Sequence, residues 1–428
     1  MAHECSTPPT AAIDSAMHDL VADYALMRMG GDASQAVAIA KSLEIQASEA
    51  MQRLKLNGHA STQGSVAKGT TVGNPDIDIF LVMDIDTPAS AFDTLAGAVA
   101  LEMNLAGIMP EQASHPYVTA TVSGYPVDIV PCYNITDIAD MKSAVDRTPL
   151  HTRWFYETFT PELTQHVRRL KAFFKGIQVY GADTFTGGFS GYACEVLIAE
   201  NGTFTNTLQR LRTIRKLIDP VDSERNILGS VSAEMFERAF AAASAYLNKP
   251  ELRYFEYDPI FAAAEMEQTV NSVIEQGYNV YVFDTPSSDA ETAAHYRALF
   301  QSATAQCNNY GFQALDRYFW DGDKFVAVII AKPLSPIRIS SGPDHSEYNE
   351  ASLAFLQKWT NDGAATVAFD NFNNRYVAAR AEYHQSHVVY MTESVAAKLM
   401  DENEHSLTPE QLTRYVFMAA AGVAPWQA

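Results

Sequence analysis

The chain has 428 residues, of which 47% are hydrophobic and 19% are charged. This composition excludes a disordered or low-complexity protein and allows about two to four folded domains. The 51 Asp and Glu residues outnumber the 30 Lys and Arg residues, and the net charge of −21 is unfavourable overall for binding nucleic acid.

We expect no targeting signal in this sequence. The first residues lack the basic and apolar regions of a signal peptide, and apolar runs such as FVAVIIA at 325–331 are too short to span a membrane. The four cysteines show neither CxxC nor zinc-site spacing. We therefore expect a cytoplasmic protein with reduced thiols and no membrane association.

The N-terminal third contains a helical region followed by a distinctive strand. Residues 11–58 carry apolar side chains at three- and four-residue spacing, which predicts helices. The stretch GSVAKGTTVGNPDIDIFLVM at 64–83 begins with a small-residue turn and ends in an apolar strand. Alternation along that strand places Asp76 and Asp78 on one face and the neighbouring isoleucines on the other.

A third acidic residue lies on a neighbouring predicted hairpin. HPYVTATVSGYPVDIVPCYNI at 115–135 alternates around a central glycine, and its second strand carries Asp128. Three carboxylates from two strands can hold two Mg²⁺ about 3.5–4 Å apart for in-line displacement. An isolated D-x-D is more often a solvated strand face. Here the Gly64-Ser65 turn, which offers donors to phosphate oxygens, favours metal-dependent phosphoryl chemistry.

The remainder of the chain changes character twice. Residues 147–225 hold 11 Lys and Arg against eight Asp and Glu, and their periodicity predicts a mostly helical domain. From residue 278 a β-α-β-β pattern predicts a small α+β sandwich of the kind often used for RNA. The one locally basic segment therefore directly follows the acidic strands.

Several longer motifs resemble a known family. The GS turn, the DID strand and the 115–135 hairpin, with SAVDRTPLHTRW, RRLKAFFKG, GFSGYACEVLI and DPVDSERN, resemble the polymerase-β-like nucleotidyltransferases, specifically the archaeal-type (class I) CCA-adding enzymes. The match is dense over roughly residues 40–230 and looser beyond. The resemblance implies a multidomain α+β fold: a nucleotidyltransferase head with a mixed sheet and helices at 1–146, a helical neck at 147–255, and a small RRM-like body and tail at 256–428, the tail at roughly 336–376.

The resemblance also implies roles for individual residues. Asp76, Asp78 and Asp128 would be the catalytic, metal-binding carboxylates, although the family often has Glu at the first position. The residues implied to bind the nucleotide are Gly64, Ser65, Lys68, His151, Lys171, Tyr180 and Arg225. Lys68 stands where the family usually has Arg, so it keeps the charge and loses the bidentate fork. Arg225 matches the arginine that helps to read the incoming base.

The activity implied by the resemblance is template-independent addition or repair of the 3′-terminal CCA of tRNA. CTP and ATP would be the substrates, two Mg²⁺ the cofactors and pyrophosphate the by-product. The expected partners are the tRNA 3′ end with its acceptor stem and TΨC arm, and a second copy in a homodimer.

Two alternatives stay open beside this activity. One is another RNA 3′-nucleotidyltransferase, of the poly(A) or oligoadenylate type, against which the long match and Arg225 argue. The other is a non-catalytic tRNA-binding protein on the same scaffold, against which the three carboxylates argue.

Overall fold

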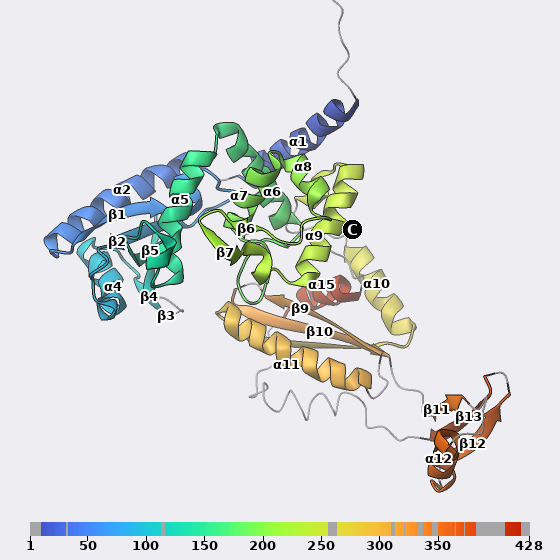
Figure 1. Ribbon diagram of the computed structural model, residues 1–428. Helices are drawn as coiled ribbons and strands as arrows, with labels where there is room; N and C mark the ends of the chain where they lie inside the picture. The colour runs from blue at the N-terminus through green and yellow to red at the C-terminus, as the bar shows by residue number, and fades with distance from the viewer. Residues whose placement is uncertain are drawn as a thin grey trace, which may run out of the picture. The chain divides into compact units, whose positions relative to one another are not determined.

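The computed structural model describes residues 10–30, 33–112, 116–255, 263–309, 313–320, 322–332, 337–344, 350–363, 365–371, 373–381 and 407–420. The chain divides into two compact units, residues 1–259 with 424–428 and residues 260–423 (Figure 1). Helices and sheets occur in both units, so the predicted α+β class is confirmed. No described helix is long and apolar enough to cross a membrane.

The head of the first unit is a five-stranded mixed sheet in the order β1-β2-β5-β4-β3. Strands β2 and β5 run parallel to each other, and the other neighbouring strands are antiparallel. Helices α2 (Ala33–Arg53) and α4 (Phe92–Glu102) cover one face of this sheet. The strands are β1 (Gly58–Gln63), β2 (Ile77–Met83), β3 (Met109–Gln112), β4 (Pro116–Val122) and β5 (Tyr125–Tyr133).

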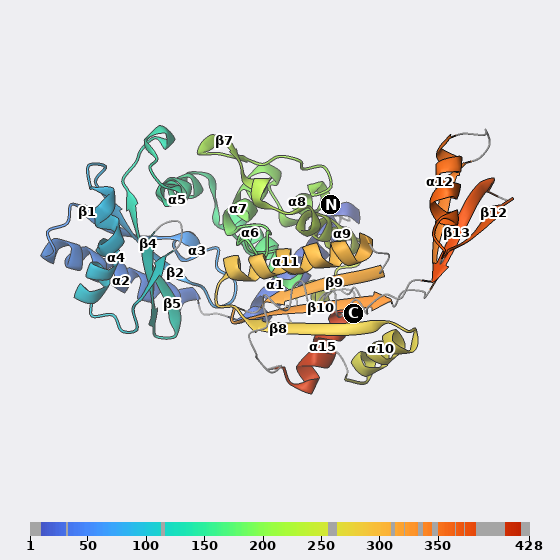
Figure 2. The same ribbon diagram turned by 90° about the horizontal axis from the view of Figure 1, so that it is seen from below.

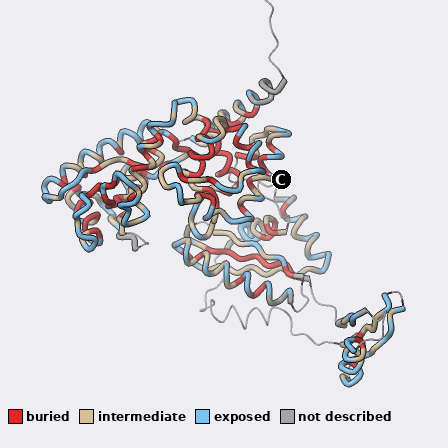
Figure 3. The backbone as a smooth tube through the Cα atoms, viewed as in Figure 1, coloured by how far each residue is buried: buried red, intermediate tan, exposed pale blue. Residues whose placement is uncertain are grey.

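The covered face of the sheet explains why the acidic strands form. Ile77, Ile79, Val127 and Ile129 are all 0% exposed and pack against α2 and α4 (Figure 3). Each fully buried aliphatic side chain contributes about 1.5–3 kcal/mol to folding, which fixes the register of both strands. Alternation then directs the intervening side chains to the opposite face.

Two details differ from the sequence-based expectation. Strand β2 begins at Ile77, so Asp76 immediately precedes the strand instead of lying within it. The helical region predicted to extend to residue 58 ends at Arg53, and residues 58–63 form β1. GHASTQ lacks apolar alternation, and the segment is a strand because it pairs with the edge of β2 from Gly58↔Met83 to Gln63↔Asp78.

The neck of the first unit is helical, as expected. Its core contains fully buried aromatic side chains, among them Phe173, Phe189 and Tyr246. Thr160 and Ser190 cap α6 and α7 by accepting hydrogen bonds from backbone N–H groups of the first turn. The neck helices are α5 (Arg147–Thr158), α6 (Pro161–Gly176), α7 (Gly191–Asn201), α8 (Phe204–Arg210) and α9 (Ala233–Asn248).

The first helix, α1 (Thr10–Met29), packs in the neck core and not on the head sheet. Arg169 on α6 pairs with Asp19 and Asp23 of α1, each at 2.7 Å. The hydroxyl of Tyr246 donates to the backbone oxygen of His18 at 2.6 Å. The range 1–146 expected for the head therefore includes a helix whose contacts lie in the neck.

The second unit contains a three-stranded antiparallel sheet in the order β8-β10-β9 (Figure 2). The residues of β10 from Phe325 to Ala331 are buried because both faces of the strand are covered. Val326, Val328 and Ile330 pack towards α10 and α15, while Phe325 packs against Phe300 of α11. The elements are α10 (Ala263–Glu275), β8 (Asn279–Pro286), α11 (Ala290–Asn309), β9 (Gln313–Trp320), β10 (Lys324–Lys332) and α15 (Pro409–Ala420).

The predicted β-α-β-β pattern is confirmed by these elements. Further along, a second three-stranded antiparallel sheet has the order β11-β13-β12 and carries α12. Its elements are β11 (Ile337–Asp344), α12 (Glu350–Thr360), β12 (Ala365–Asp370) and β13 (Arg375–Ala381). The sheet thus extends past the expected end of the tail at residue 376.

One glycine of the neck permits a close backbone crossing. A Cβ atom at Gly176, the last residue of α6, would lie 2.3 Å from the Cα of Phe255 and 2.4 Å from the backbone oxygen of Tyr254. Both residues pack on Phe173 in the core. Glycine is therefore required where this segment crosses the helix.

We expect Gly176→Ala to destabilise the first unit by about 1–3 kcal/mol, because the added methyl group displaces backbone atoms within the core. The matched control is Gly97→Ala in α4, where no heavy atom lies within 4 Å of the new Cβ. Alanine should stabilise that helix by about 0.5–1 kcal/mol. Urea unfolding of both variants measures the difference, and equal midpoints would contradict the close approach.

Candidate active site

The candidate catalytic carboxylates lie on the face of the head sheet opposite the isoleucines. Asp78 on β2 is the direct parallel-register partner of Asp128 on β5. Both side chains are half-buried, and Asp76 is exposed just ahead of β2. The structure therefore brings Asp78 and Asp128 side by side, with Asp76 two residues along the chain from Asp78.

These three carboxylates repel one another. Burial, followed by the nearby charges of Asp128 and Asp76, raises the pKa of Asp78 to about 7, while Lys68 opposes the shift. Ionising an acid with such a pKa costs free energy in the folded protein, and a bound cation would offset that free energy. The electrostatics of this face thus favour a positively charged ligand.

The predicted phosphate turn lies directly against this group. Gly64 has φ +67°, and a Cβ atom there would lie 1.9 Å from Oδ2 of Asp78. Gly64 and Ser65 open the short helix α3 (Gly64–Lys68), which follows β1. Only glycine fits at this position, because both its backbone conformation and its contact with Asp78 exclude a side chain.

The carboxylates of the head offer only part of the ligand set of a divalent cation. Among the residues that the structure describes, no three His, Cys, Asp or Glu side chains form a complete metal cage. The adjacent carboxylates of Asp78 and Asp128 nevertheless match the ligands of Mg²⁺, which is usually held by one or two carboxylates together with substrate phosphates. These residues fit a cation that arrives with a nucleotide.

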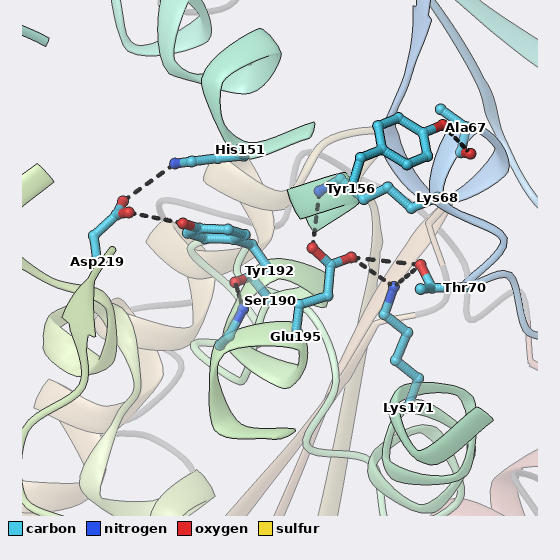
Figure 4. A network of polar contacts seen from close by, with 11 residues as sticks. Ala67, Lys68, Thr70, His151, Tyr156, Lys171, Ser190, Tyr192, Glu195 and Asp219 are labelled. Atoms are coloured by element: carbon cyan, nitrogen blue, oxygen red, sulfur yellow. Dashed lines mark hydrogen bonds and ion pairs between the residues drawn. The ribbon is translucent and has the colours of Figure 1, made fainter. Parts of the chain in front are cut away.

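A buried charge cluster forms around Glu195 (Figure 4), and its member Lys68 is near enough to Asp78 to lower the pKa of that acid. Glu195 on α7 accepts from Nζ of Lys68 at 2.8 Å on one oxygen and from Nζ of Lys171 at 3.4 Å on the other. Lys171 also donates to Oγ1 of Thr70 at 2.8 Å. The side chains of the three charged residues are only 3–5% exposed. Two cations therefore share one anion inside the first unit.

The protonation of this cluster follows from its charges. Burial alone would raise the pKa of Glu195, but the charges of Lys68 and Lys171 outweigh it and hold that pKa below its usual value. Burial lowers the pKa of Lys171. Both lysine ammonium groups are directed at Glu195, and their contact with nucleotide phosphates remains a prediction.

Tyr180 reaches the same region from the loop between α6 and α7. A Cβ atom at Gly191 would lie 2.9 Å from the Tyr180 hydroxyl and 3.3 Å from Nζ of Lys171, so these two groups converge over the start of α7. Burial raises the pKa of Tyr180, as do the neighbouring charges, including those of Asp76 and Asp78. The hydroxyl therefore stays protonated near the carboxylates.

A second polar cluster forms around Asp219, the last residue of β6 (Ile218–Asp219). Oδ2 of Asp219 pairs with Nη1 of Arg225 at 2.9 Å and with Nε2 of His151 at 3.2 Å. The Tyr192 hydroxyl donates to Oδ1 at 2.7 Å. His151 stacks on the Tyr192 ring with centroids 3.7 Å apart. The predicted residues His151 and Arg225 thus meet on one buried carboxylate.

The two clusters are connected through Tyr192 of α7 (Figure 4). Its hydroxyl contacts Asp219, and its ring lies 5.5 Å from Nζ of Lys68, which pairs with Glu195. On the head side, the Tyr156 hydroxyl donates to the backbone oxygen of Ala67 at 2.6 Å and fixes α3 to α5. Of the predicted residues, Lys68, Lys171, His151 and Arg225 consequently belong to one continuous polar network.

Sequence reasoning missed several members of this network, among them Tyr192, Glu195 and Asp219. Tyr192 and Glu195 lie within GFSGYACEVLI, and Asp219 opens DPVDSERN, yet only their neighbours were singled out. The available signal was Glu195, a charge flanked by apolar residues in the middle of α7, which requires a buried partner.

A cavity of about 310 Å³ lies beside the second cluster, where Val221 donates to Asp219. It is lined by Leu150, Arg153, Trp154 and Glu157 of α5, by residues 136–138 and by Pro220 and Val221. None of the predicted site residues lines it. The candidate site therefore rests on the carboxylates and the polar network and not on this cavity.

We expect Glu195→Gln to lower stability by about 3–5 kcal/mol at neutral pH, because it leaves two buried lysines without their anion. The pKa of Glu195 is lowered in the folded state, so its contribution is present above about pH 4.5 and is lost on acidification. The deficit of the variant in urea unfolding should shrink as the pH falls. Glu200→Gln, at an exposed position of the same helix, should stay within about 0.5 kcal/mol of wild type.

We expect Asp128→Asn to stabilise the metal-free protein by about 1 kcal/mol, the order of one pKa unit, because it relieves repulsion on Asp78. The raised pKa of Asp78 means that its ionisation costs stability as the pH rises from about 4 to about 7. Thermal unfolding in EDTA should show the gain above pH 7 and little below pH 4. A variant less stable than wild type at pH 8 would contradict this account.

Two family models match the first unit. The nucleotidyltransferase domain model matches residues 45–151, which include Gly64, the three carboxylates and His151. The model for the second domain of tRNA nucleotidyltransferase matches residues 165–218, which include Lys171 and Tyr180. Together they cover both clusters apart from Asp219 and Arg225.

Curated relatives extend the similarity over most of the chain. A CCA-adding enzyme of Thermoplasma volcanium is 29% identical over 75% of this chain and 76% of its own length. That of Halobacterium salinarum strain R1 is 30% identical over 80% and 81%, and that of Pyrobaculum islandicum is 30% identical over 78% and 83%. The chain belongs to the CCA-adding enzyme family, the archaeal-type nucleotidyltransferases that its motifs resemble.

Proposed function

We propose that this protein adds or repairs the 3′-terminal CCA of tRNA, using CTP and ATP without a template and releasing pyrophosphate. The observation that carries the proposal is the parallel pairing of Asp78 with Asp128, with the Gly64 turn against Asp78, in a chain of this family. Acidic oxygens next to a bare backbone turn support a site at which a triphosphate and its cations would meet.

The carboxylates Asp76, Asp78 and Asp128 would hold the divalent cations, which we take to be two Mg²⁺. Such cations, when bound, neutralise the triphosphate and activate the attacking 3′ hydroxyl. Gly64 leaves room for phosphate oxygens beside Asp78, and Ser65 follows it with a hydroxyl. Lys68, Lys171 and Tyr180 would supply further donors to the phosphates, and the convergence of Lys171 and Tyr180 over the start of α7 supports this role.

His151 and Arg225 would contribute to recognition of the nucleotide's sugar and base. Burial lowers the pKa of His151, although Asp219 opposes the effect, so the imidazole is neutral near pH 7. Arg225 offers directed N–H donors to base edges, and its side chain is 35% exposed. Cytosine and adenine would thus be distinguished by the neck, while the head would carry out the transfer.

The RNA partner would be the tRNA 3′ end with its acceptor stem and TΨC arm. We assign the second unit to gripping that RNA and propose the cytoplasm as the compartment and a homodimer as the assembled form. Because the whole chain carries a net charge of −21, this grip would depend on shape and a few phosphate contacts.

The deciding experiment incubates the protein with a tRNA that ends before CCA, Mg²⁺ and labelled CTP or ATP, and sizes the products. Three added nucleotides with both triphosphates support the proposal. A ladder of added A residues indicates another RNA 3′-nucleotidyltransferase, and no addition indicates a non-catalytic tRNA-binding protein.

Asp128→Asn should reduce addition at least about 1,000-fold, because it removes one of the paired ligands of the cations, and the protein should remain folded. The matched control is Asp84→Asn, at an exposed position beyond the other end of β2, which should retain wild-type activity. Near wild-type activity of Asp128→Asn would refute the metal assignment.

A further inference from the structure

We propose that Asp219 is a positioning residue that fixes the guanidinium of Arg225 and thereby sets the choice between cytosine and adenine. The inference rests on the proposed function and deepens it. Asp219 lies at the end of β6, and Arg225 lies on the paired strand β7 (Asp222–Asn226). The Asp219 side chain is 0% exposed, so it acts through its neighbours and not on a nucleotide.

Four donors occupy the two oxygens of this carboxylate. Oδ1 accepts from the Tyr192 hydroxyl at 2.7 Å and from the backbone N–H of Val221 at 3.0 Å. Oδ2 accepts from Nη1 of Arg225 at 2.9 Å and pairs with Nε2 of His151 at 3.2 Å. Asp219 is therefore held by four donors.

The carboxylate is ionised despite its burial. Burial alone would raise the pKa of Asp219, but the hydrogen bonds from His151, Val221 and Tyr192 hold it well below its usual range. A buried anion of this kind strongly favours an adjacent guanidinium. The charge of Asp219 thus holds Nη1 of Arg225 in place throughout the neutral pH range.

Fixing Nη1 fixes the direction of the remaining guanidinium donors. A guanidinium is planar and carries five N–H donors in a rigid fork, so one anchored nitrogen restricts the plane of the others. The rings of His151 and Tyr192, which both donate to Asp219, stack with centroids 3.7 Å apart and an interplanar angle of 15°. This stacking holds both donors in place. The orientation of the Arg225 guanidinium is consequently fixed by its neighbours before a nucleotide binds.

Asparagine at position 219 would release Arg225 selectively. The N–H of Val221 and the guanidinium of Arg225 are both donors only, and each needs an accepting oxygen. The carboxylate of Asp219 has two such oxygens, whereas the amide of asparagine has one accepting oxygen and one donating nitrogen. Because Val221 belongs to the backbone, the amide oxygen would take the place of Oδ1, and the nitrogen would face Arg225. His151 can adapt by changing its tautomer, but the guanidinium cannot accept a hydrogen bond.

The test compares Asp219→Asn, Arg225→Ala and the double variant on a tRNA that lacks CCA. For each, kcat and KM are measured separately for CTP and ATP, together with the frequency of wrong-base addition. We expect Asp219→Asn to weaken base discrimination roughly 10- to 100-fold, the range of one directed guanidinium contact. The double variant should lose no more than Arg225→Ala alone, since Asp219 acts through Arg225.

Asp222→Asn is the matched control. It lies in the same hairpin but pairs with Arg147 at 3.2 Å, so base discrimination should match that of wild type. Asp219→Asn with discrimination within twofold of wild type, or losses that multiply in the double variant, would overturn the proposal. Unfolding midpoints of all variants establish that the comparison is made on folded protein.

A binding measurement separates this inference from the proposed function. Equilibrium binding of CTP and of ATP is measured in the presence of Mg²⁺ for Asp128→Asn and for Asp128→Asn with Asp219→Asn. A changed ratio of the two affinities supports the role of Asp219, and an unchanged ratio refutes it. If the wild-type protein adds no nucleotide to tRNA, the proposed function is refuted. The binding comparison would still decide whether Asp219 sets the preference between CTP and ATP.

Discussion

The ion cluster of Glu195 with Lys68 and Lys171 is the contact on which the site depends. It joins α3, which follows the first strand of the head, to α6 and α7 of the neck. A buried carboxylate between two ammonium groups tolerates little displacement, because loss of either partner leaves a charge without compensation. The Gly64 turn and the carboxylates are thereby held at a fixed place relative to the neck.

The site contains one group with excess negative charge and one group with excess positive charge. The three aspartates of the head repel one another, and the lysines beside Glu195 outnumber their anion. Lys68 participates in both, since it pairs with Glu195 and also opposes the raised pKa of Asp78. A triphosphate with divalent cations carries both signs of charge and would satisfy both groups at once.

Local patterns were sufficient to predict much of this arrangement. Alternation of isoleucine and aspartate indicated on which face of the sheet Asp78 lies. The glycine-centred hairpin indicated the same for Asp128. The position of Asp76 ahead of β2 and the pairing of β1 were not predictable, because β1 has no apolar alternation and is a strand only through its neighbour. Lys68 and Glu195 are 127 positions apart, and no local pattern indicates that such residues will meet.

The packing of α1 into the neck core makes the neck a discontinuous domain interrupted by the head. The first helix leaves the ribosome early, yet Arg169 and Tyr246, to which it binds, are synthesised some 150 to 230 residues later. All strands of the head sheet lie between these segments, so the sheet can be completed while the neck still lacks most of its helices. The chain order thus favours a folding sequence in which the carboxylate-bearing strands form first, and closure of the neck around α1 comes last.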